Sequence, residues 1–311
     1  MEMQWPLILF TLFMAWSAGV FGTAAVLALA GGGKRVQMPA LVTSVVLLAV
    51  GGIAVFFHLE HWDRIFNGFG NPTSGITQEL IVIVLMAVVM VVYFVYLRKP
   101  EPVVPRWLAV AAIVVSVALV VVMSHSYNMA ARPAWDSPLL WLAYLGNAAL
   151  FGPLTVTLLA AFFPDAEGVS EDAPEAVSTE AVARAGSVLA TSGVVGAVAN
   201  AVLSVAWGAS VVMSAASFTE VGLYWDPTHP NYPIANPAEA ANILSGEASL
   251  LFWIGVVVIG CAVPVVCAAL GRRKGAPAVP LAGVGLACAI VGAVCLRMVF
   301  YSAGASVFMF Y

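Results

Sequence analysis

The sequence contains very little charge. Only 9% of its 311 residues are Asp, Glu, Lys or Arg, whereas 62% are hydrophobic and the mean hydropathy is +1.00. A soluble domain carries about a quarter charged residues, so this composition excludes an ordinary soluble protein. Only twelve residues of the whole chain are basic. We therefore expect no nucleic acid among its partners.

Motifs that supply chemistry in enzymes and metalloproteins are also missing. None of the four cysteines belongs to a Cys-x-x-Cys pair, and all lie at or beyond Cys261, so we expect buried apolar side chains rather than iron–sulfur ligands. No Gly-rich phosphate loop, nucleophile elbow or zinc-binding spacing occurs. Among the histidines, only His58 and His125 are placed to face each other across two apolar runs. We expect the chain to carry no haem.

Long apolar runs recur along the whole chain instead. Each is long enough to cross the ~30 Å hydrocarbon core of a bilayer. Backbone groups in lipid must be bonded within the protein, and the period-2 alternation of a membrane barrel is absent, so the runs are predicted to be helices. The predicted fold is an all-α polytopic membrane helix bundle in a single domain, residues 1–311. Its eight spans are placed near 5–30, 40–58, 76–97, 107–125, 138–162, 186–213, 247–270 and 281–301.

Basic residues concentrate in alternate loops. If the loops after the first, third, fifth and seventh spans face the cytoplasm, nine basic residues lie there, against Arg64 and Arg132 on the opposite side. Cytoplasmic loops of membrane proteins carry an excess of Lys and Arg. We therefore predict a multi-pass protein of the cytoplasmic membrane with both termini outside.

Two loops are unusually long. The loop 164–185 holds six of the sixteen acidic residues, a composition that favours a solvated tether over a docking site. The loop 214–246 carries aromatic residues, among them Tyr224 and Trp225. It is predicted to form a cap that packs either on the bundle or on a partner.

A polar cluster lies where the second and third spans reach the predicted outer surface. His58 ends the second span, Arg64 and Asn67 lie in the connecting loop, and Glu79 begins the third span at membrane depth. An ionisable group at that depth is costly and indicates a functional site. The alternative is an ordinary interfacial loop in which Arg64 pairs with Glu79, and composition does not decide between the two.

Short motifs follow one another in a definite order along the chain. They are Trp5-Pro6-Leu7, Phe10-Thr11-x-Phe13, Ala18-Gly19-x-Phe21, His58-Leu59, Arg64-x-Phe66-Asn67, Glu79, Tyr127-Asn128, Pro133-x-Trp135, Pro138, Gly152-Pro153 and Arg297-x-x-Phe300-Tyr301 with Gly304. In this order they resemble the DmsC-type membrane anchors of dimethyl sulfoxide reductases. The chain departs from that pattern at residues 60–62, where Glu-His-Trp follows His58-Leu59.

The resemblance implies a prokaryotic membrane anchor without haem, iron–sulfur cluster or molybdopterin of its own. It implies two partners, a four-cluster ferredoxin-like iron–sulfur subunit and a molybdopterin catalytic subunit. This chain would then be a non-catalytic subunit that oxidises menaquinol in anaerobic respiration. Quinol oxidation releases protons, which a histidine and a partly buried carboxylate are suited to accept. We predict that His58 and Glu79 accept them, that Arg64 holds the Glu79 carboxylate, and that Asn67 is a further quinol contact.

Arg297 is predicted to reach the same interface. It lies about 24 Å along a helix from Leu281, near the outer end of the last span. Two interpretations explain an arginine at this position. Its guanidinium group either extends toward water at the membrane surface (snorkelling) or lines the quinol cleft.

Two other functions stay open. One is a purely structural membrane anchor without a quinol site. The other is a secondary transporter, although its ionisable groups would lie near the midplane between inverted repeats. Here they cluster at one face, and no repeat is visible.

Overall fold

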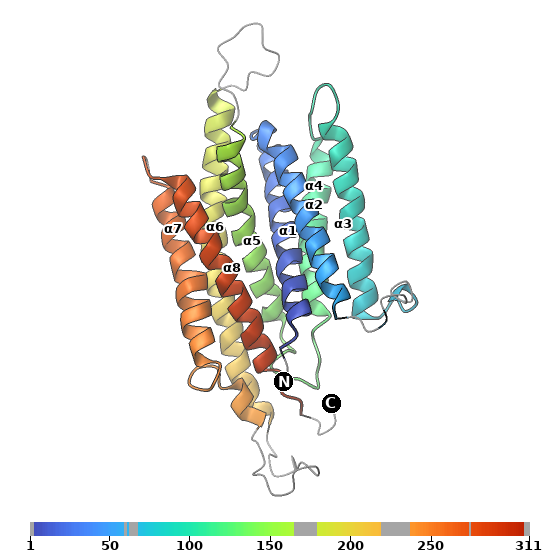
Figure 1. Cartoon of the computed structure of the whole chain (residues 1–311), viewed down its shortest axis with the longest axis vertical. Helices are drawn as coiled ribbons and strands as arrows, with labels where there is room; N and C mark the ends of the chain where they lie inside the picture. The colour runs from blue at the N-terminus through green and yellow to red at the C-terminus, as the bar shows by residue number, and fades with distance from the viewer. Residues whose placement is uncertain are drawn as a thin grey trace, which may run out of the picture.

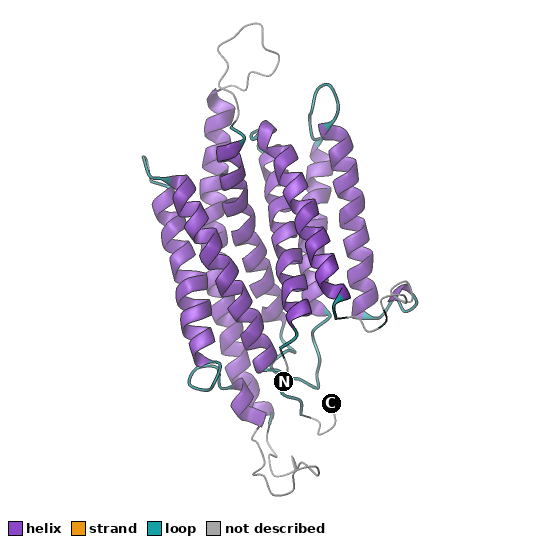
Figure 2. Ribbon diagram, viewed as in Figure 1, coloured by secondary structure: helices purple, strands orange, loops and turns teal. Residues whose placement is uncertain are grey.

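The computed structural model is an all-helical bundle (Figures 1 and 2). Within the part of the chain that it describes, eight helices are long and apolar enough to cross a membrane, and no strand occurs. The predicted fold class is therefore confirmed. The structure describes residues 3–58, 61, 68–164, 179–218, 237–273 and 275–307.

The helices run alternately up and down through the bundle. Both termini lie at its lower end in Figure 1, together with the loop that joins α2 to α3. The loops that join α1 to α2 and α3 to α4 lie at the upper end. Which end faces the cytoplasm stays a prediction. The elements are α1 (Trp5–Leu29), α2 (Lys34–Phe56), α3 (Gly75–Leu97), α4 (Arg106–His125), α5 (Pro138–Phe162), α6 (Thr179–Ser214), η2 (Ala215–Ser217), η4 (Pro237–Ala241), η5 (Leu251–Ala262), α7 (Val263–Gly271) and α8 (Ala278–Ser302).

α2 and α6 begin further ahead of their predicted apolar runs than the other helices do. α2 begins at Lys34 and α6 at Thr179, because helical hydrogen bonding continues into polar sequence beyond the span. In α6, Glu180 lies in the first turn, where a negative charge is favourable, and it pairs with Arg184 at 2.8 Å. Hydropathy marks the membrane-crossing part of a helix rather than its ends. Most residues of the two long loops, 165–178 and 219–236, lie outside the described residues.

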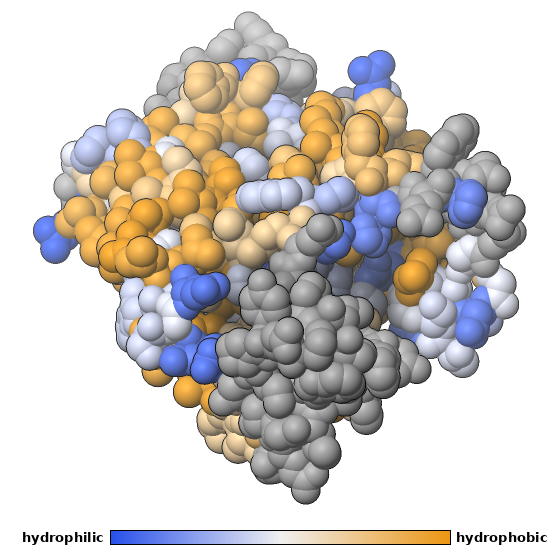
Figure 3. Space-filling model, turned by 60° about the horizontal axis from the view of Figure 1, so that its bottom comes forward, coloured by the Kyte–Doolittle hydropathy of each residue, from blue (hydrophilic) through white to orange (hydrophobic). Residues whose placement is uncertain are grey.

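The sides of the bundle are apolar. Large hydrophobic residues such as Val46, Val91 and Val202 are more than half exposed. Figure 3 shows hydrophobic side chains over wide areas of the surface, with polar residues gathered in smaller groups. Contiguous apolar surface of this extent suits contact with lipid. It supports a multi-pass membrane protein.

α1 and α5 approach so closely that their backbones touch. A Cβ added to Gly152 would lie 2.1 Å from the carbonyl oxygen of Gly19, and one added to Gly19 would lie 2.1 Å from the carbonyl oxygen of Ala148. Small residues permit this kind of approach between membrane helices. Gly19 and Gly152 both belong to the motifs noted in the sequence.

We predict that Gly152→Ala lowers the stability of the bundle by about 1–3 kcal/mol, because the added methyl group forces α1 and α5 apart. Thermal unfolding of the purified chain in detergent measures the change. Gly52→Ala is the control, since a Cβ there meets no atom within 4 Å. Equal unfolding temperatures for the two variants would contradict the close contact.

The seventh span changes helix type along its length. Leu251–Ala262 is a π-helix, which continues as α7 from Val263. Pro264 has no backbone N–H to donate to the carbonyl of Gly260 four residues earlier. The side-chain amide of Asn200, on α6, donates to that carbonyl at 3.0 Å. A side chain from the neighbouring helix α6 therefore donates to the Gly260 carbonyl in place of the N–H that Pro264 lacks.

Candidate functional site

A pocket of about 320 Å³ lies between α1, α2 and α3 at the end of the bundle that carries the termini. Its walls are mostly apolar, and they include Phe10 from α1, Val55 from α2 and Ile83 from α3. Two ionisable side chains, His61 and Glu79, also line it. The volume lies within the range of small-molecule sites, about 300–1,000 Å³. The pocket therefore combines an apolar interior with groups that exchange protons.

Glu79 lies in the second turn of α3, and a residue from another loop bonds its carboxylate. The hydroxyl of Ser126, just after α4, donates to Glu79 Oε1. The same hydroxyl lies 2.8 Å from the carbonyl oxygen of Met123. Gly75 permits the approach, because a Cβ there would lie 2.7 Å from the Cβ of Ser126. The side chain of Glu79 is thus positioned by a hydroxyl that can donate or accept a hydrogen bond.

The loop between α2 and α3 is tied to α3 beside this pocket. The hydroxyl of Thr77 donates to the carbonyl of Gly68. A Cβ on Gly68 would lie 2.8 Å from a methyl carbon of Leu80, so the loop backbone approaches the helix closely. Because Gly68 itself lines the pocket, these contacts fix one part of its wall.

The structure brings together only some of the residues predicted for the site. Glu79 lines the pocket, whereas His58 ends α2 with an exposed side chain and is not among the lining residues. His61, three residues later, takes that place. Arg64 and Asn67 lie outside the described residues. The quinol-binding roles of all these residues remain predictions.

Arg297 lies inside the bundle rather than at its surface. Its side chain is 0% exposed, so the snorkelling interpretation is wrong. Its Nε donates to the hydroxyl of Thr11 at 2.8 Å, and its Nη2 donates to the carbonyl of the same residue at 3.1 Å. Its Nη1 donates to Asn147 Oδ1 at 3.0 Å and to the carbonyl of Ala293 at 2.9 Å. The guanidinium also lies 4.3 Å from the ring centroid of Tyr144.

This network continues across the bundle. Asn147, on α5, donates to Asn200 Oδ1 on α6 at 2.6 Å, and Asn200 reaches the carbonyl of Gly260 as described above. Within the described residues, no carboxylate pairs with Arg297. Uncharged oxygen atoms and an aromatic ring therefore stabilise this buried cation. Sequence reasoning identified Arg297 but missed Asn147 and Asn200, which carry no charge to distinguish them.

A tyrosine pair connects the region of Glu79 with Arg297. Tyr127 follows Ser126 directly and shares a side-chain hydrogen bond with Tyr301, one turn after Arg297 on α8. Burial, with further contributions from nearby Tyr301 and Glu79, raises the pKa of Tyr127 well above its ordinary value. Its hydroxyl therefore keeps its proton at neutral pH. The tyrosine pair therefore lies within electrostatic reach of both Glu79 and Arg297.

The loop between α4 and α5 also holds the end of α8. The indole N–H of Trp135 donates to the carbonyl of Phe300 at 2.7 Å, and the two rings stack with centroids 4.4 Å apart. Arg132 donates to the carbonyl of Gly304 at 2.8 Å. The motifs around Tyr127 and Arg297 thus meet in space. His125 packs its ring against Trp141, with centroids 5.0 Å apart.

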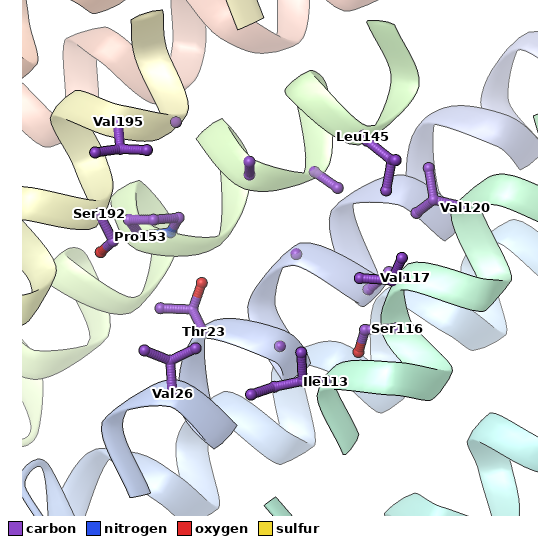
Figure 4. A pocket seen from close by; sticks show the side chains of 16 residues that line it. Thr23, Val26, Ile113, Ser116, Val117, Val120, Leu145, Pro153, Ser192 and Val195 are labelled. Atoms are coloured by element: carbon purple, nitrogen blue, oxygen red, sulfur yellow. The ribbon is translucent and has the colours of Figure 1, made fainter. Parts of the chain in front are cut away.

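A second pocket, of about 340 Å³, lies between α1, α4, α5 and α6 (Figure 4). Its described lining contains no ionisable side chain, and its polar groups are hydroxyls such as those of Thr23, Ser116 and Ser192. Such a lining offers no proton acceptor near neutral pH. The pocket beside Glu79 is therefore the better candidate for proton-coupled chemistry. Among the described residues, no group of three or more His, Cys, Asp or Glu could hold a metal ion.

Comparison with protein families identifies the chain. A family model described as the DMSO reductase anchor subunit (DmsC) matches residues 1–303. No curated protein matches the chain. The matched region includes all eight membrane-spanning helices, the pocket beside Glu79 and the hydrogen-bond network of Arg297. The chain therefore belongs to the DMSO reductase anchor subunit (DmsC) family.

Proposed function

We propose that this anchor subunit binds menaquinol in the pocket between α1, α2 and α3 and oxidises it. The observation that carries the proposal is the carboxyl group of Glu79 in the wall of an otherwise apolar pocket of about 320 Å³. A naphthoquinol ring needs apolar walls and hydrogen-bond partners for its two hydroxyl groups. His61 and Glu79, which both line this pocket, supply such partners.

The chemistry follows from the balance of the reaction. Oxidation of a quinol to a quinone releases two electrons and two protons. Glu79 accepts the proton of one hydroxyl, and a histidine accepts the other. His61 is the better placed histidine because it lines the pocket, while His58, predicted from the sequence, lies three residues earlier in the chain. Ser126 bonds Glu79 in both of its protonation states, as donor to the carboxylate or as acceptor from the acid.

The two electrons leave through partner subunits. An anchor of a DMSO reductase complex works with catalytic and iron–sulfur subunits. We infer that a four-cluster ferredoxin-like subunit takes the electrons from the quinol and passes them to a molybdopterin subunit. The complex then functions in anaerobic respiration at the cytoplasmic membrane of a prokaryote. This chain itself contributes the quinol site and the membrane anchorage, without haem, and both of its termini face outward.

Binding of a quinol analogue tests the proposal against a purely structural anchor. We expect a non-oxidisable naphthoquinol analogue to bind the purified complex with one site per anchor chain, and the Ile83→Trp variant, which fills the pocket, to abolish binding. Val117→Trp, in the wall of the pocket of Figure 4, should leave binding intact. Quenching of the analogue's fluorescence measures both. If only Val117→Trp removes saturable binding, the quinol site lies in the pocket of Figure 4 instead. If the wild-type complex binds no analogue, the chain is a purely structural anchor.

A further inference from the structure

A third cavity lies at the end of the bundle opposite to the termini. Its volume is about 350 Å³, and its walls come from α5 and α6 on one side and from α7 and α8 on the other. Figure 1 shows these helix pairs side by side, with the loop between α7 and α8 at their upper end. Small residues such as Ala160, Ala190 and Ala268 form much of the lining, and none of the described residues that line it is charged. The cavity is shaped to receive an apolar chain.

Two glycines leave the α6 wall of this cavity open. A Cβ added to Gly186 would meet no atom within 4 Å, and one added to Gly193 would meet only the Cβ of Pro153, at 4.0 Å. A tightly packed interface between helices would fill that space. In a membrane, such space is available to lipid.

The mouth of the cavity is basic. Gly271 and Ala278 line its end, and Arg272 and Arg273 follow Gly271 directly with exposed side chains. Within the described part of the chain, neither arginine has a side-chain partner. Lys274 continues the basic run in the sequence. Two exposed cationic residues therefore follow directly after a residue that lines an apolar cavity.

We propose that this cavity binds an anionic phospholipid. The phosphodiester pairs with Arg272 and Arg273, because guanidinium groups bind phosphate oxygens through paired N–H donors. One acyl chain occupies the cavity below. Basic pockets between membrane helices are a recurrent way of binding acidic headgroups. A neighbouring cavity of about 380 Å³ shares Ala160, Gly186 and Leu189 with this one and has room for the second chain.

Native mass spectrometry of the purified complex tests the site. The complex is exposed to equal amounts of phosphatidylglycerol and phosphatidylcholine with identical chains, and the retained lipid is counted. We expect one phosphatidylglycerol per anchor chain in preference to phosphatidylcholine. In Arg272→Gln/Arg273→Gln, retention should fall about tenfold or more. Gly186→Leu should also lower it, because leucine occupies the cavity while both arginines remain.

The control removes the same charge elsewhere. Arg98 and Lys99 follow α3 at the same end of the bundle, where the adjacent pocket holds only about 90 Å³. Arg98→Gln/Lys99→Gln should leave retention unchanged, and Arg272→Lys/Arg273→Lys should keep most of it. Equal losses in the two glutamine variants would show a general charge effect and overturn the site. Equal retention of the two lipids, or phosphatidylglycerol retained by Arg272→Gln/Arg273→Gln, would overturn it too.

Discussion

Replacing Glu79 with glutamine is expected to slow quinol-driven substrate reduction by about 10²–10⁴-fold while the complex still assembles. Glutamine keeps the size of the side chain and can still accept a hydrogen bond from Ser126, but it cannot take up a proton. The fall is measured as the rate with a reduced menaquinol analogue, per assembled complex in membranes. Electrons from an artificial dye bypass the pocket, so dye-driven reduction should stay at the wild-type rate.

A neighbouring residue provides the control for this result. Gln78 lies next to Glu79 but bonds the carbonyl of Pro72 in an exposed position, so Gln78→Ala should retain quinol turnover. Parallel His58→Gln and His61→Gln variants separate the histidine predicted from the sequence from the one that lines the pocket. Wild-type quinol rates in Glu79→Gln would exclude this carboxylate as a proton acceptor. In that case the pocket would have only a structural role.

Arg297→Met is expected to produce the largest loss of stability in the chain. Methionine has a similar length but no donors, so Asn147 Oδ1 loses the N–H that it accepts from, and the two oxygens of Thr11 each lose one hydrogen bond. An unsatisfied buried polar group costs about 1–3 kcal/mol, and these losses together predict destabilisation of about 3 kcal/mol or more. The midpoint of thermal unfolding in detergent and the yield of assembled complex measure it.

Arg106→Met is the matched substitution, because Arg106 is exposed at the start of α4. It should unfold like the wild type. The same pair also decides between two roles for Arg297. If Arg297→Met unfolds normally and loses only quinol turnover, the arginine acts at the quinol pocket instead of holding the helices together.

The sequence predicts Glu79 and Arg297 for one reason: an ionisable group within an apolar run is costly unless it has a partner. It does not predict those partners. Ser126 lies 47 residues from Glu79 and reaches it through the close approach at Gly75. Counting residues predicts how far along its helix Arg297 lies, but it does not predict whether the side chain points into the bundle or toward lipid. The last span is apolar all round, so periodicity does not indicate which face is buried.

His58 and His61 illustrate the same limit at shorter range. Both lie in the segment that links the second and third spans, and the family pattern favours the first. In the structure the second lines the pocket, whereas the first has an exposed side chain just after the end of α2 at Phe56. The direction in which a loop returns depends on contacts such as that of Thr77 with Gly68. These join residues with no common sequence period.

The buried cation of the last helix also bears on how the protein is made. An arginine in a nascent membrane helix is costly to insert, by about 2.5–3.5 kcal/mol at the helix centre and by less toward the helix end, where Arg297 lies in α8. The oxygen atoms that compensate it belong to Thr11 and Asn147, in helices synthesised long before α8. Those helices are thus already in the bilayer when the ribosome releases α8. The final helix can enter the membrane against a prepared surface, and its integration becomes the step that closes the bundle.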